Sequence, residues 1–569
     1  MINRLKVYSL CLLLSFFILI ARLFYWQIYK GKGLSAQARV QYQSGYALLA
    51  PRGNILAADS TWLSASGKSW LVYGVPPDLK KGSKKTAETL APFFVEDEDK
   101  TSLLSEIDRI NELLSKGGIQ WTPLRTKVSD ETKQNIEKLN LKGIGFEFQE
   151  TRIYPEASSG AHLLGFVGKN NEGQDEGYFG LEGFYDKTLT GKPGFITRDS
   201  DASGAPIILG AFREMSAIGG VNLLTHIDKT VQLTLDKKLK HGIEKYGALA
   251  GSAIVMNPKN GGILGMSSFP SYDPQKYWEY GDQFFNNPTI FSSFEPGSIF
   301  KVLIMAAGLD SGVINPDTKC DSCFGPLKID KYFIETWNNE YYPESTMADV
   351  IVHSDNVGMA FVGQKLGQEK MFDYLNSFGI GQNTGIDLQG EISPKLREKG
   401  SWGNIDVATA SFGQGVATTP IQMLRAVAAI ANKGRIITPQ VVDKIIGEGW
   451  EEDIKEKDGG RVISEKAANE MTQMMVEAAK KGEAKWTNIG GFKVAGKTGT
   501  AQIPIAGHYD EEKTNASFIG FAPYDNPKFI MIVTLQEPSS SPWASETAAP
   551  LWYSIAVDLF NYFGIQPDN

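Results

Sequence analysis

A serine and a lysine three positions apart are the first candidates for chemistry in this chain. Serine is a weak nucleophile until a neighbouring base takes its proton. Ser298 and Lys301 have the spacing that brings two side chains to one side of a helix. The preceding Pro296-Gly297 fits a helix start, where backbone N–H groups can stabilise a developing oxyanion. The pattern predicts Ser298 as nucleophile and Lys301 as general base, provided that burial and a nearby cation lower the pKa of the lysine.

Alone, this Ser-x-x-Lys pattern is weak, because average composition predicts on the order of two chance matches in a chain of this length. A solvated helix start is the alternative interpretation. Ser354-Asp355-Asn356 follows downstream, and Lys497-Thr498-Gly499-Thr500 lies further on. By the same composition arithmetic, all three motifs occur in this order by chance in well under about one chain in a hundred. The ordered set is typical of penicillin-binding proteins and β-lactamases.

The second motif offers groups that can move and hold a proton. The hydroxyl of Ser354 can relay a proton between Lys301 and a leaving amine. Asn356 offers a donor and an acceptor, both to Lys301 and to a substrate amide. We expect Asp355 to shape its own loop and not to touch substrate.

The third motif has the residue types that bind a peptide carboxylate. Lys497 supplies a fixed positive charge, and it is also the candidate cation that lowers the pKa of Lys301. Thr498 and Thr500 are predicted hydroxyl donors to the substrate. On an extended strand, Gly499 would leave room for a peptide that pairs with the exposed backbone as an added strand. The backbone N–H groups of Ser298 and Thr500 are the predicted oxyanion hole.

The sequence pattern predicts that the helices and strands that position these motifs form an α+β domain. Terminal strands and a terminal helix are expected to enclose a helical insert. The strands are predicted at residues 251–257, 262–267, 492–497, 516–522 and 529–535, and the flanking helices at 230–246 and 549–563. We place this domain at residues 230–565.

Residues 35–225 form a predicted mixed α/β pedestal domain. They contain a strand-like run at 69–75 and a helix after Ser129, whose side chain can cap it. No cluster of histidine, cysteine or carboxylate residues stands out in this part of the sequence. We therefore expect a non-catalytic scaffold.

An uncharged apolar run at residues 7–21 is about as long as a membrane-spanning helix needs, roughly 20 residues, if Arg22 extends towards the interface. Tyr25 and Trp26 suit a membrane boundary. A cleaved signal peptide and a buried core helix are the alternatives. No small-residue cleavage site follows the run, which favours an uncleaved anchor over residues 1–26.

Composition and cysteine content exclude other classes of protein. A net charge of -8 and 42% hydrophobic residues indicate neither disorder nor a nucleic-acid partner. Cys320 and Cys323 are spaced Cys-x-x-Cys without further metal ligands near them in sequence, so we expect neither a metal nor a cofactor. The pair could form a small disulfide or remain two thiols in a loop.

With these motifs, the sequence resembles the class B penicillin-binding proteins, the monofunctional peptidoglycan D,D-transpeptidases, over nearly its whole length. The sequence around Ser298 and Gly413 is more similar to that of division-type members than to that of elongation-type ones. Ala57 to Ser60 depart from the family's usual turn. The motifs that carry the resemblance are Arg52 to Ile55, Arg152 to Pro155, His162 to Gly168, Gly180 to Gly183, Glu295 to Ser298, Ser411 to Gly415 and Lys497 to Gln502.

The resemblance implies a reaction, an orientation and partners. A stem peptide ending in D-Ala-D-Ala would acylate Ser298 and release its last D-Ala, and an amine of a neighbouring stem would resolve the acyl-enzyme. β-Lactams would be covalent inhibitors at the same serine. The catalytic domain would lie outside the cytoplasmic membrane, with a membrane glycan polymerase and divisome proteins as partners. A D,D-carboxypeptidase or β-lactamase, and a non-catalytic β-lactam sensor or polymerase partner, are the alternative functions.

Overall fold

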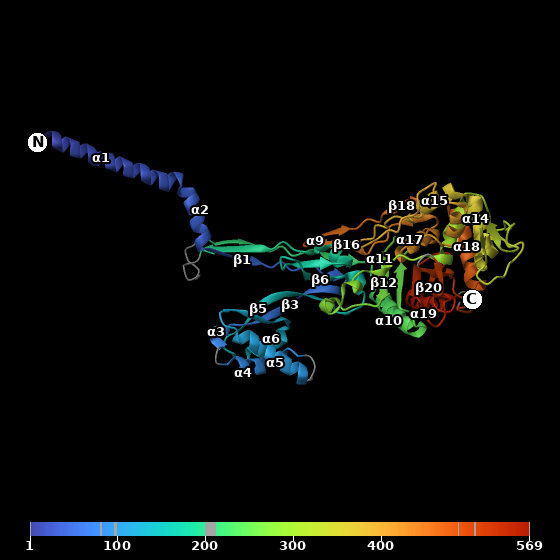
Figure 1. Cartoon of the computed structure of the whole chain (residues 1–569), viewed down its shortest axis with the longest axis horizontal. Coiled ribbons are helices and arrows are strands. Elements are labelled where there is room, and N and C mark those ends of the chain that lie inside the picture. The colour runs from blue at the N-terminus through green and yellow to red at the C-terminus, as the bar shows by residue number, and fades with distance from the viewer. Residues whose placement is uncertain are drawn as a thin grey trace. The chain divides into compact units, whose positions relative to one another are not determined.

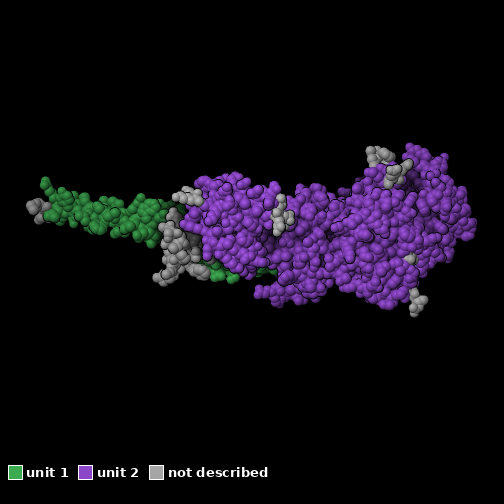
Figure 2. Space-filling model, turned by 90° about the horizontal axis from the view of Figure 1, so that it is seen from below, with its two compact units in different colours: residues 1–52, 190–220 green, residues 53–189, 221–569 purple. Residues whose placement is uncertain are grey.

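The computed structural model describes residues 2–79, 82–95, 100–199, 212–487, 489–505 and 508–567. The chain divides into two compact units, which Figure 2 colours separately. The first unit comprises residues 1–52 and 190–220, and the second comprises residues 53–189 and 221–569.

The first unit contains the predicted anchor. Helix α1 (Ile2–Phe24) continues into a π-helical turn (Tyr25–Tyr29) and then α2 (Gly31–Tyr42) (Figure 1). Among the described residues, one helix, Asn3–Tyr29, is long and apolar enough to cross a membrane. The Arg22 guanidinium lies 5.3 Å from the centroid of the Trp26 ring, a cation–π contact that suits an interfacial arginine. Three antiparallel strands complete the unit: β1 (Gln43–Leu48), β8 (Gly194–Asp199) and β9 (Phe212–Met215).

The pedestal part of the second unit is built on a mixed sheet. In the described residues its strand order is β17-β16-β10-β2-β3-β4, and β5 also pairs with β3. The predicted strand at 69–75 corresponds to the end of β3. Ser129 accepts a hydrogen bond from Thr132 N–H at 3.1 Å as the predicted cap of α6 (Asp130–Glu137). The strands are β2 (Ile55–Leu56), β3 (Trp62–Gly74), β4 (Thr122–Val128), β5 (Ile144–Ile153), β10 (Asn222–Thr225), β16 (Val442–Gly447) and β17 (Trp450–Asp453).

Strands β16 and β17 come from the sequence of the predicted catalytic domain, yet they extend the pedestal sheet through β10. Short helices and a hairpin complete this part. They are α3 (Pro76–Leu79), α4 (Ser83–Leu90), α5 (Lys100–Ser115), α6 (Asp130–Glu137), α7 (Ala161–Leu164), β6 (Phe166–Lys169), β7 (Asp175–Tyr178), α8 (Gly180–Phe184) and α9 (Asp186–Leu189).

The catalytic part is centred on an antiparallel sheet with the order β12-β11-β21-β20-β19. Side chains alternate between its two faces. On β21, Ile530 and Ile532 join the core under the helical insert, whereas Met531 and Val533 join the core under α10 and α19. The elements are α10 (Lys229–Tyr246), β11 (Ala250–Met256), β12 (Ile263–Phe269), β19 (Ala495–Ile505), β20 (His508–Ala522), β21 (Phe529–Gln536) and α19 (Ala548–Tyr562).

The helical insert lies between β12 and β19 in sequence, which confirms the predicted α+β arrangement. It contains α11 (Pro288–Phe291), α12 (Lys301–Asp310), α13 (Met347–Val352), α14 (Asn356–Leu366), α15 (Gln368–Ser377), α16 (Asn404–Ala410), α17 (Pro420–Ala431) and α18 (Glu465–Lys481). Small hairpins within it pair β13 (Leu327–Ile329) with β14 (Tyr332–Ile334) and β15 (Arg435–Ile437) with β18 (Asp458–Arg461).

The fold corrects one sequence expectation, the start of a strand, and decides another that was open, the state of two cysteines. The strand predicted at 492–497 begins only at Ala495, because the chain is still turning at Ile489 to Val494, where Phe492 accepts a hydrogen bond from Val494. Cys320 and Cys323, for which a disulfide and free thiols were both open, form a disulfide. Both cysteines are buried, and the backbone N–H of Cys320 donates to Ser345, just before α13.

Candidate active site

Ser298 lies in a 3₁₀ turn (Gly297–Phe300) that runs directly into α12. A 3₁₀ turn has about three residues per turn, so the side chains of Ser298 and Lys301 leave the backbone on the same side. Gly297 has a φ of +54°, and a Cβ there would lie 2.8 Å from the carbonyl oxygen of Thr500. Its N–H donates to the carbonyl of Gly413 at 3.1 Å. The turn is therefore packed closely between β19 and the loop that contains Gly413.

Lys301 is fully buried and makes three hydrogen bonds with the second motif. Its Nζ donates to the carbonyl of Ser354 at 2.5 Å, to Ser354 Oγ at 3.2 Å and to Asn356 Oδ1 at 2.8 Å. Burial, followed by the Lys497 charge, lowers the pKa of Lys301 to about 7. Both expected causes are present. The described hydrogen bonds include none between Lys301 and the Ser298 hydroxyl, so the pairing of nucleophile and base stays a prediction.

Ser354, Asp355 and Asn356 form the junction between α13 and α14. Ser354 has a φ of +56°, a left-handed conformation that is costly for a residue other than glycine and is found at functional sites. Asp355 Oδ1 accepts from the N–H groups of Val357 and Gly358 at 2.7 and 3.1 Å. Asp355 thus caps α14, which confirms its predicted role in shaping the loop.

The third motif lies on β19, the last strand in the described order of the sheet. Lys497 Nζ donates to Ser354 Oγ at 3.0 Å and to Thr498 Oγ1 at 3.2 Å. Burial lowers the pKa of Lys497, and the carboxylate of Glu483 opposes that shift. Thr500 Oγ1 accepts from the N–H of Ala544 at 3.0 Å, which leaves its own proton available to a ligand.

Two members of this motif differ from the expected arrangement. A Cβ on Gly499 would lie 2.9 Å from the carbonyl oxygen of Pro296 and 2.8 Å from a methyl group of Ile299. The glycine therefore admits the nucleophile turn, and room for a peptide beside it stays a prediction. Thr498 is only 5% exposed, and its hydroxyl donates to Glu483 Oε2 at 3.0 Å. Direct contact of Thr498 with substrate stays a prediction.

Sequence reasoning assigned no individual role to several groups that surround the motifs. Glu483 follows α18 and carries no motif of its own. Glu295 accepts hydrogen bonds from the Gly415 N–H at 3.1 Å and from the Tyr509 hydroxyl at 3.2 Å. The rings of Trp337 and Trp543 meet edge to face with centroids 5.2 Å apart, and Trp337 Nε1 donates to the carbonyl of His353. The nearness of Glu295 to Ser298 in sequence was the available signal; the others are brought close only by the fold.

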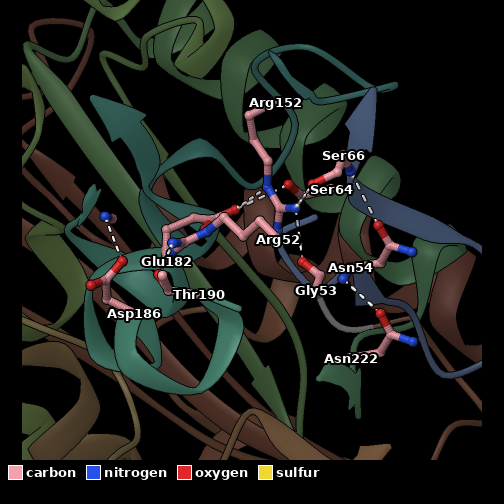
Figure 3. Close-up of polar contacts among 11 residues, drawn as sticks. Arg52, Gly53, Asn54, Ser64, Ser66, Arg152, Glu182, Asp186, Thr190 and Asn222 are labelled. Atoms are coloured by element: carbon pink, nitrogen blue, oxygen red, sulfur yellow. Dashed lines mark hydrogen bonds and ion pairs between the residues drawn. The ribbon is translucent and has the colours of Figure 1, made fainter. Parts of the chain in front are cut away.

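The N-terminal motifs of the family also meet in space, within the pedestal (Figure 3). Arg152 Nε donates to Glu182 Oε1 at 2.6 Å, and both side chains are buried. Arg152 Nη1 donates to the carbonyl of Gly53 at 2.8 Å, and Asn54 Oδ1 accepts from the N–H of Ser66 at 3.1 Å. A buried ion pair of this kind ties three sequence-distant segments together.

Two family models match consecutive parts of the chain. Residues 47–224 match the penicillin-binding protein dimerisation domain, and residues 251–556 match the penicillin-binding protein transpeptidase domain. The chain belongs to the class B penicillin-binding proteins. It is thus a serine-type D-Ala-D-Ala transpeptidase by family.

Relatives of this class B penicillin-binding protein have several named roles. Stage V sporulation protein D of Bacillus subtilis is 32% identical over 97% of this chain and 84% of its own length. The peptidoglycan D,D-transpeptidase FtsI of Escherichia coli is 29% identical over 78% of this chain and 73% of its own. Penicillin-binding protein 2X of Streptococcus thermophilus, a solved structure, superimposes with a TM-score of 0.74 at 24% identity, covering 92% of this chain and 80% of that one. This last likeness concerns the fold.

Proposed function

We propose that this penicillin-binding protein cross-links peptidoglycan stem peptides through an acyl-enzyme on Ser298. The Ser298 oxygen attacks the carbonyl carbon between the last two D-Ala residues of a donor stem. The peptide bond breaks, and the terminal D-Ala leaves as an amine after gaining a proton. An amine of a neighbouring stem then attacks the ester, which frees the Ser298 hydroxyl and completes the cross-link.

The single observation that carries the proposal is the buried Lys301 between Ser354 and Asn356. A lysine with a pKa of about 7 is neutral in a large fraction of molecules near neutral pH, so it can take the proton of Ser298. Ser354 Oγ lies within hydrogen-bond distance of both Lys301 and Lys497. We infer that Ser354 passes the proton to the leaving amine, and that the same groups act in reverse when the second amine attacks.

Charge stabilisation and substrate alignment follow from the turn that packs on β19. The close approach of Gly297 to the Thr500 carbonyl holds the backbone of Ser298 beside that of Thr500, which supports the assignment of their N–H groups to the oxyanion hole. Lys497 and the Thr500 hydroxyl are suited to the terminal carboxylate of the donor. Because β19 is the last strand in the described order, the donor peptide can add to the sheet there.

We further propose where in the cell this protein acts, because its stem-peptide substrates lie outside the cytoplasm. The N-terminal helix anchors the chain in the cytoplasmic membrane, with the catalytic part on the outer side, where stem peptides are found. The activity serves the division septum, together with a membrane glycan polymerase. The names of relatives such as FtsI of Escherichia coli support the septal assignment.

The test is covalent labelling by a fluorescent penicillin, followed by an assay with a D-Ala-D-Ala donor peptide and an acceptor amine. We expect the full chain to be labelled and Ser298→Ala to remain unlabelled. The acyl group should pass to the added amine faster than to water. Equal labelling of Ser298→Ala would overturn the nucleophile, and rapid penicillin hydrolysis without a stable adduct would overturn the transferase in favour of a hydrolase.

A further inference from the structure

Glu483 is a carboxylate that the reaction described above does not use, yet it lies beside the third motif. It comes directly after α18 and its C-cap residue, Gly482. A Cβ on Gly482 would lie 2.9 Å from the carbonyl oxygen of Val352 and 2.5 Å from that of Ala478. The absence of a side chain at this glycine lets the chain leave α18 against the end of α13. Glu483 is thereby fixed next to β19.

One hydroxyl group, that of Thr498, connects Glu483 to the active-site lysine Lys497. Thr498 Oγ1 donates to Glu483 Oε2 at 3.0 Å, and Lys497 Nζ donates to the same Thr498 Oγ1 at 3.2 Å. Lys497 in turn donates to Ser354 Oγ at 3.0 Å. Val352, Glu483, Lys497 and Thr498 also line one small pocket. The carboxylate is therefore one hydroxyl away from the ammonium that contacts Ser354.

The charge of Glu483 matters because Lys301 and Lys497 share a buried site. Two cations in a low-dielectric site repel each other, and burial disfavours the charged form of both. Glu483 raises the pKa of both lysines, and Asp355 raises that of Lys301. Several charged or titratable groups lie on the described elements packed around the two lysines. They include Asp310 on α12, Asp349 on α13, His353 after it, Asp355 before α14, Lys365 on α14, Glu465, Lys466, Glu470, Glu477, Lys480 and Lys481 on α18, and Glu483 after it.

The described hydrogen bonds join none of the other members of this set to Lys497 or Thr498. Asp349 forms the capping box with Thr346, and Glu477 pairs with Lys481 at 2.6 Å on the exposed side of α18. His353 stacks on Tyr342 with ring centroids 4.1 Å apart. Asp355 uses Oδ1 to cap α14. Among the described residues of this set, Glu483 is thus the one that hydrogen bonds connect to Lys497, through the Thr498 hydroxyl.

We propose that Glu483 is a positioning residue that acts through Thr498 to keep Lys497 charged and aligned on Ser354, and so sets the pH range of acylation. The inference rests on the proposed function, because it assigns Lys301 the part of base and Lys497 the part of fixed cation. Without the carboxylate, both lysines lose protons more readily. Lys301 becomes an available base at lower pH, and Lys497 loses its charge at lower pH as well.

The experiment measures the rate of labelling by a fluorescent penicillin from pH 5 to pH 10, with the full chain in detergent. Wild type should give a bell-shaped profile, whose rising limb reports Lys301 and whose falling limb reports Lys497. Glu483→Gln should move both limbs to lower pH by about one unit, the lower end of the effect of a nearby opposite charge. Relative to its own maximum, the variant should therefore label faster than wild type near pH 6 and slower near pH 9.

Two further variants separate charge from packing. Glu477→Gln removes the same charge from the exposed side of α18 and should leave both limbs in place. Glu483→Asp keeps the carboxylate and should keep the wild-type limbs even if the overall rate changes, and it remains informative if Glu483→Gln fails to fold. The inference would be overturned if the limbs of the pH profile stay in place in Glu483→Gln. It would also be overturned if Glu477→Gln or Glu483→Asp shifts them as far as Glu483→Gln does. A wild-type protein that is not labelled at any pH would overturn the proposed function instead.

Discussion

Lys301 and Lys497 donate to the same atom, Ser354 Oγ, at 3.2 and 3.0 Å. Both lysines are buried, with exposed fractions of 0% and 3%. Two full positive charges on one hydroxyl in a buried site are unfavourable, so the site favours one neutral and one charged lysine. The lysine that becomes neutral near pH 7 is Lys301. This division of roles between two like residues underlies the predictions that concern catalysis.

The first prediction concerns the pH dependence of acylation. Because only neutral Lys301 can accept the proton of Ser298, the labelling rate of wild type should rise with pH through about 7, the pKa of Lys301. Lys497→Met removes the charge that helps to lower this pKa, so the rising limb should move to higher pH while the maximal rate falls. Stopped-flow labelling at each pH measures both effects. A limb that stays in place in Lys497→Met would show that burial alone sets the pKa.

The second prediction concerns Ser354, the proposed proton relay, whose φ is positive at 56°. Ser354→Ala removes the shared acceptor and should slow acylation about 10²- to 10⁴-fold, the usual contribution of a positioned proton-transfer group. Ser354→Gly should be equally slow, yet more stable than Ser354→Ala by about 1 kcal/mol, because alanine retains the strain of the left-handed conformation. Labelling rates and urea unfolding measure the two effects separately.

A matched control for this pair is available nearby in the chain. Ser345 is buried, and its hydroxyl donates to the carbonyl of Tyr342 and not to a lysine. Ser345→Ala should therefore label at nearly the wild-type rate. A slow Ser345→Ala would mean that the loss in Ser354→Ala reflects general disturbance of the segment.

The third prediction concerns the tie between the β19–β20 hairpin and the nucleophile turn. The Tyr509 hydroxyl donates to Glu295 at 3.2 Å, and Glu295 is three residues before Ser298. Tyr509→Phe removes a hydrogen bond to a partly buried carboxylate, a loss of about 1.5 kcal/mol, and should slow acylation roughly tenfold if the turn depends on it. Tyr562→Phe removes a similar bond, to Asp228, away from the three motifs, and should leave the rate unchanged. Equal acylation rates in wild type and Tyr509→Phe would show that the hydrogen bond between Tyr509 and Glu295 stabilises the hairpin locally but does not affect the nucleophile turn.

The residues with an obligatory chemical type could be predicted from the sequence. Ser298, Lys301, Ser354 and Lys497 stand in recognisable motifs because acyl transfer depends on the chemical type of its nucleophile, base and cation, and the structure brings the last three together. The role proposed for Glu483 could not be predicted, because it depends on a hydrogen bond to Thr498, which lies 15 positions away in the sequence. Any polar residue after a helix end looks the same before folding.

The same limit applies to the fold. Helix α10 was predictable because it has local signals: Asp228 caps its start and Gly247 ends it in the left-handed conformation. The strand pattern of β21 was also local. The pairing of β16 with β10 was not, because alternating residues mark a strand without naming its partner. For the same reason, the insertion of Ile299 against Gly499 could only be seen in the structure.

The fourth prediction concerns the buried ion pair of the pedestal. Arg152→Met removes the guanidinium that forms an ion pair with Glu182, whose side chain is 0% exposed. Removing one member of a buried pair typically costs about 3–5 kcal/mol, because the remaining charge stays desolvated. Urea unfolding should show this loss in the free energy of unfolding, while the fraction that remains folded is labelled by penicillin at the wild-type rate.

The exposed pair between Lys169 and Asp175 provides the control for this substitution. Its atoms are 2.8 Å apart, and the remaining Asp175 side chain is 50% exposed, so water screens its charge when the lysine is removed. Lys169→Met should therefore cost no more than about 1 kcal/mol. Similar losses in the two variants would mean that Arg152 contributes no more than a surface ion pair. A slower labelling rate of folded Arg152→Met would instead show that the pedestal pair acts on the Ser298 turn.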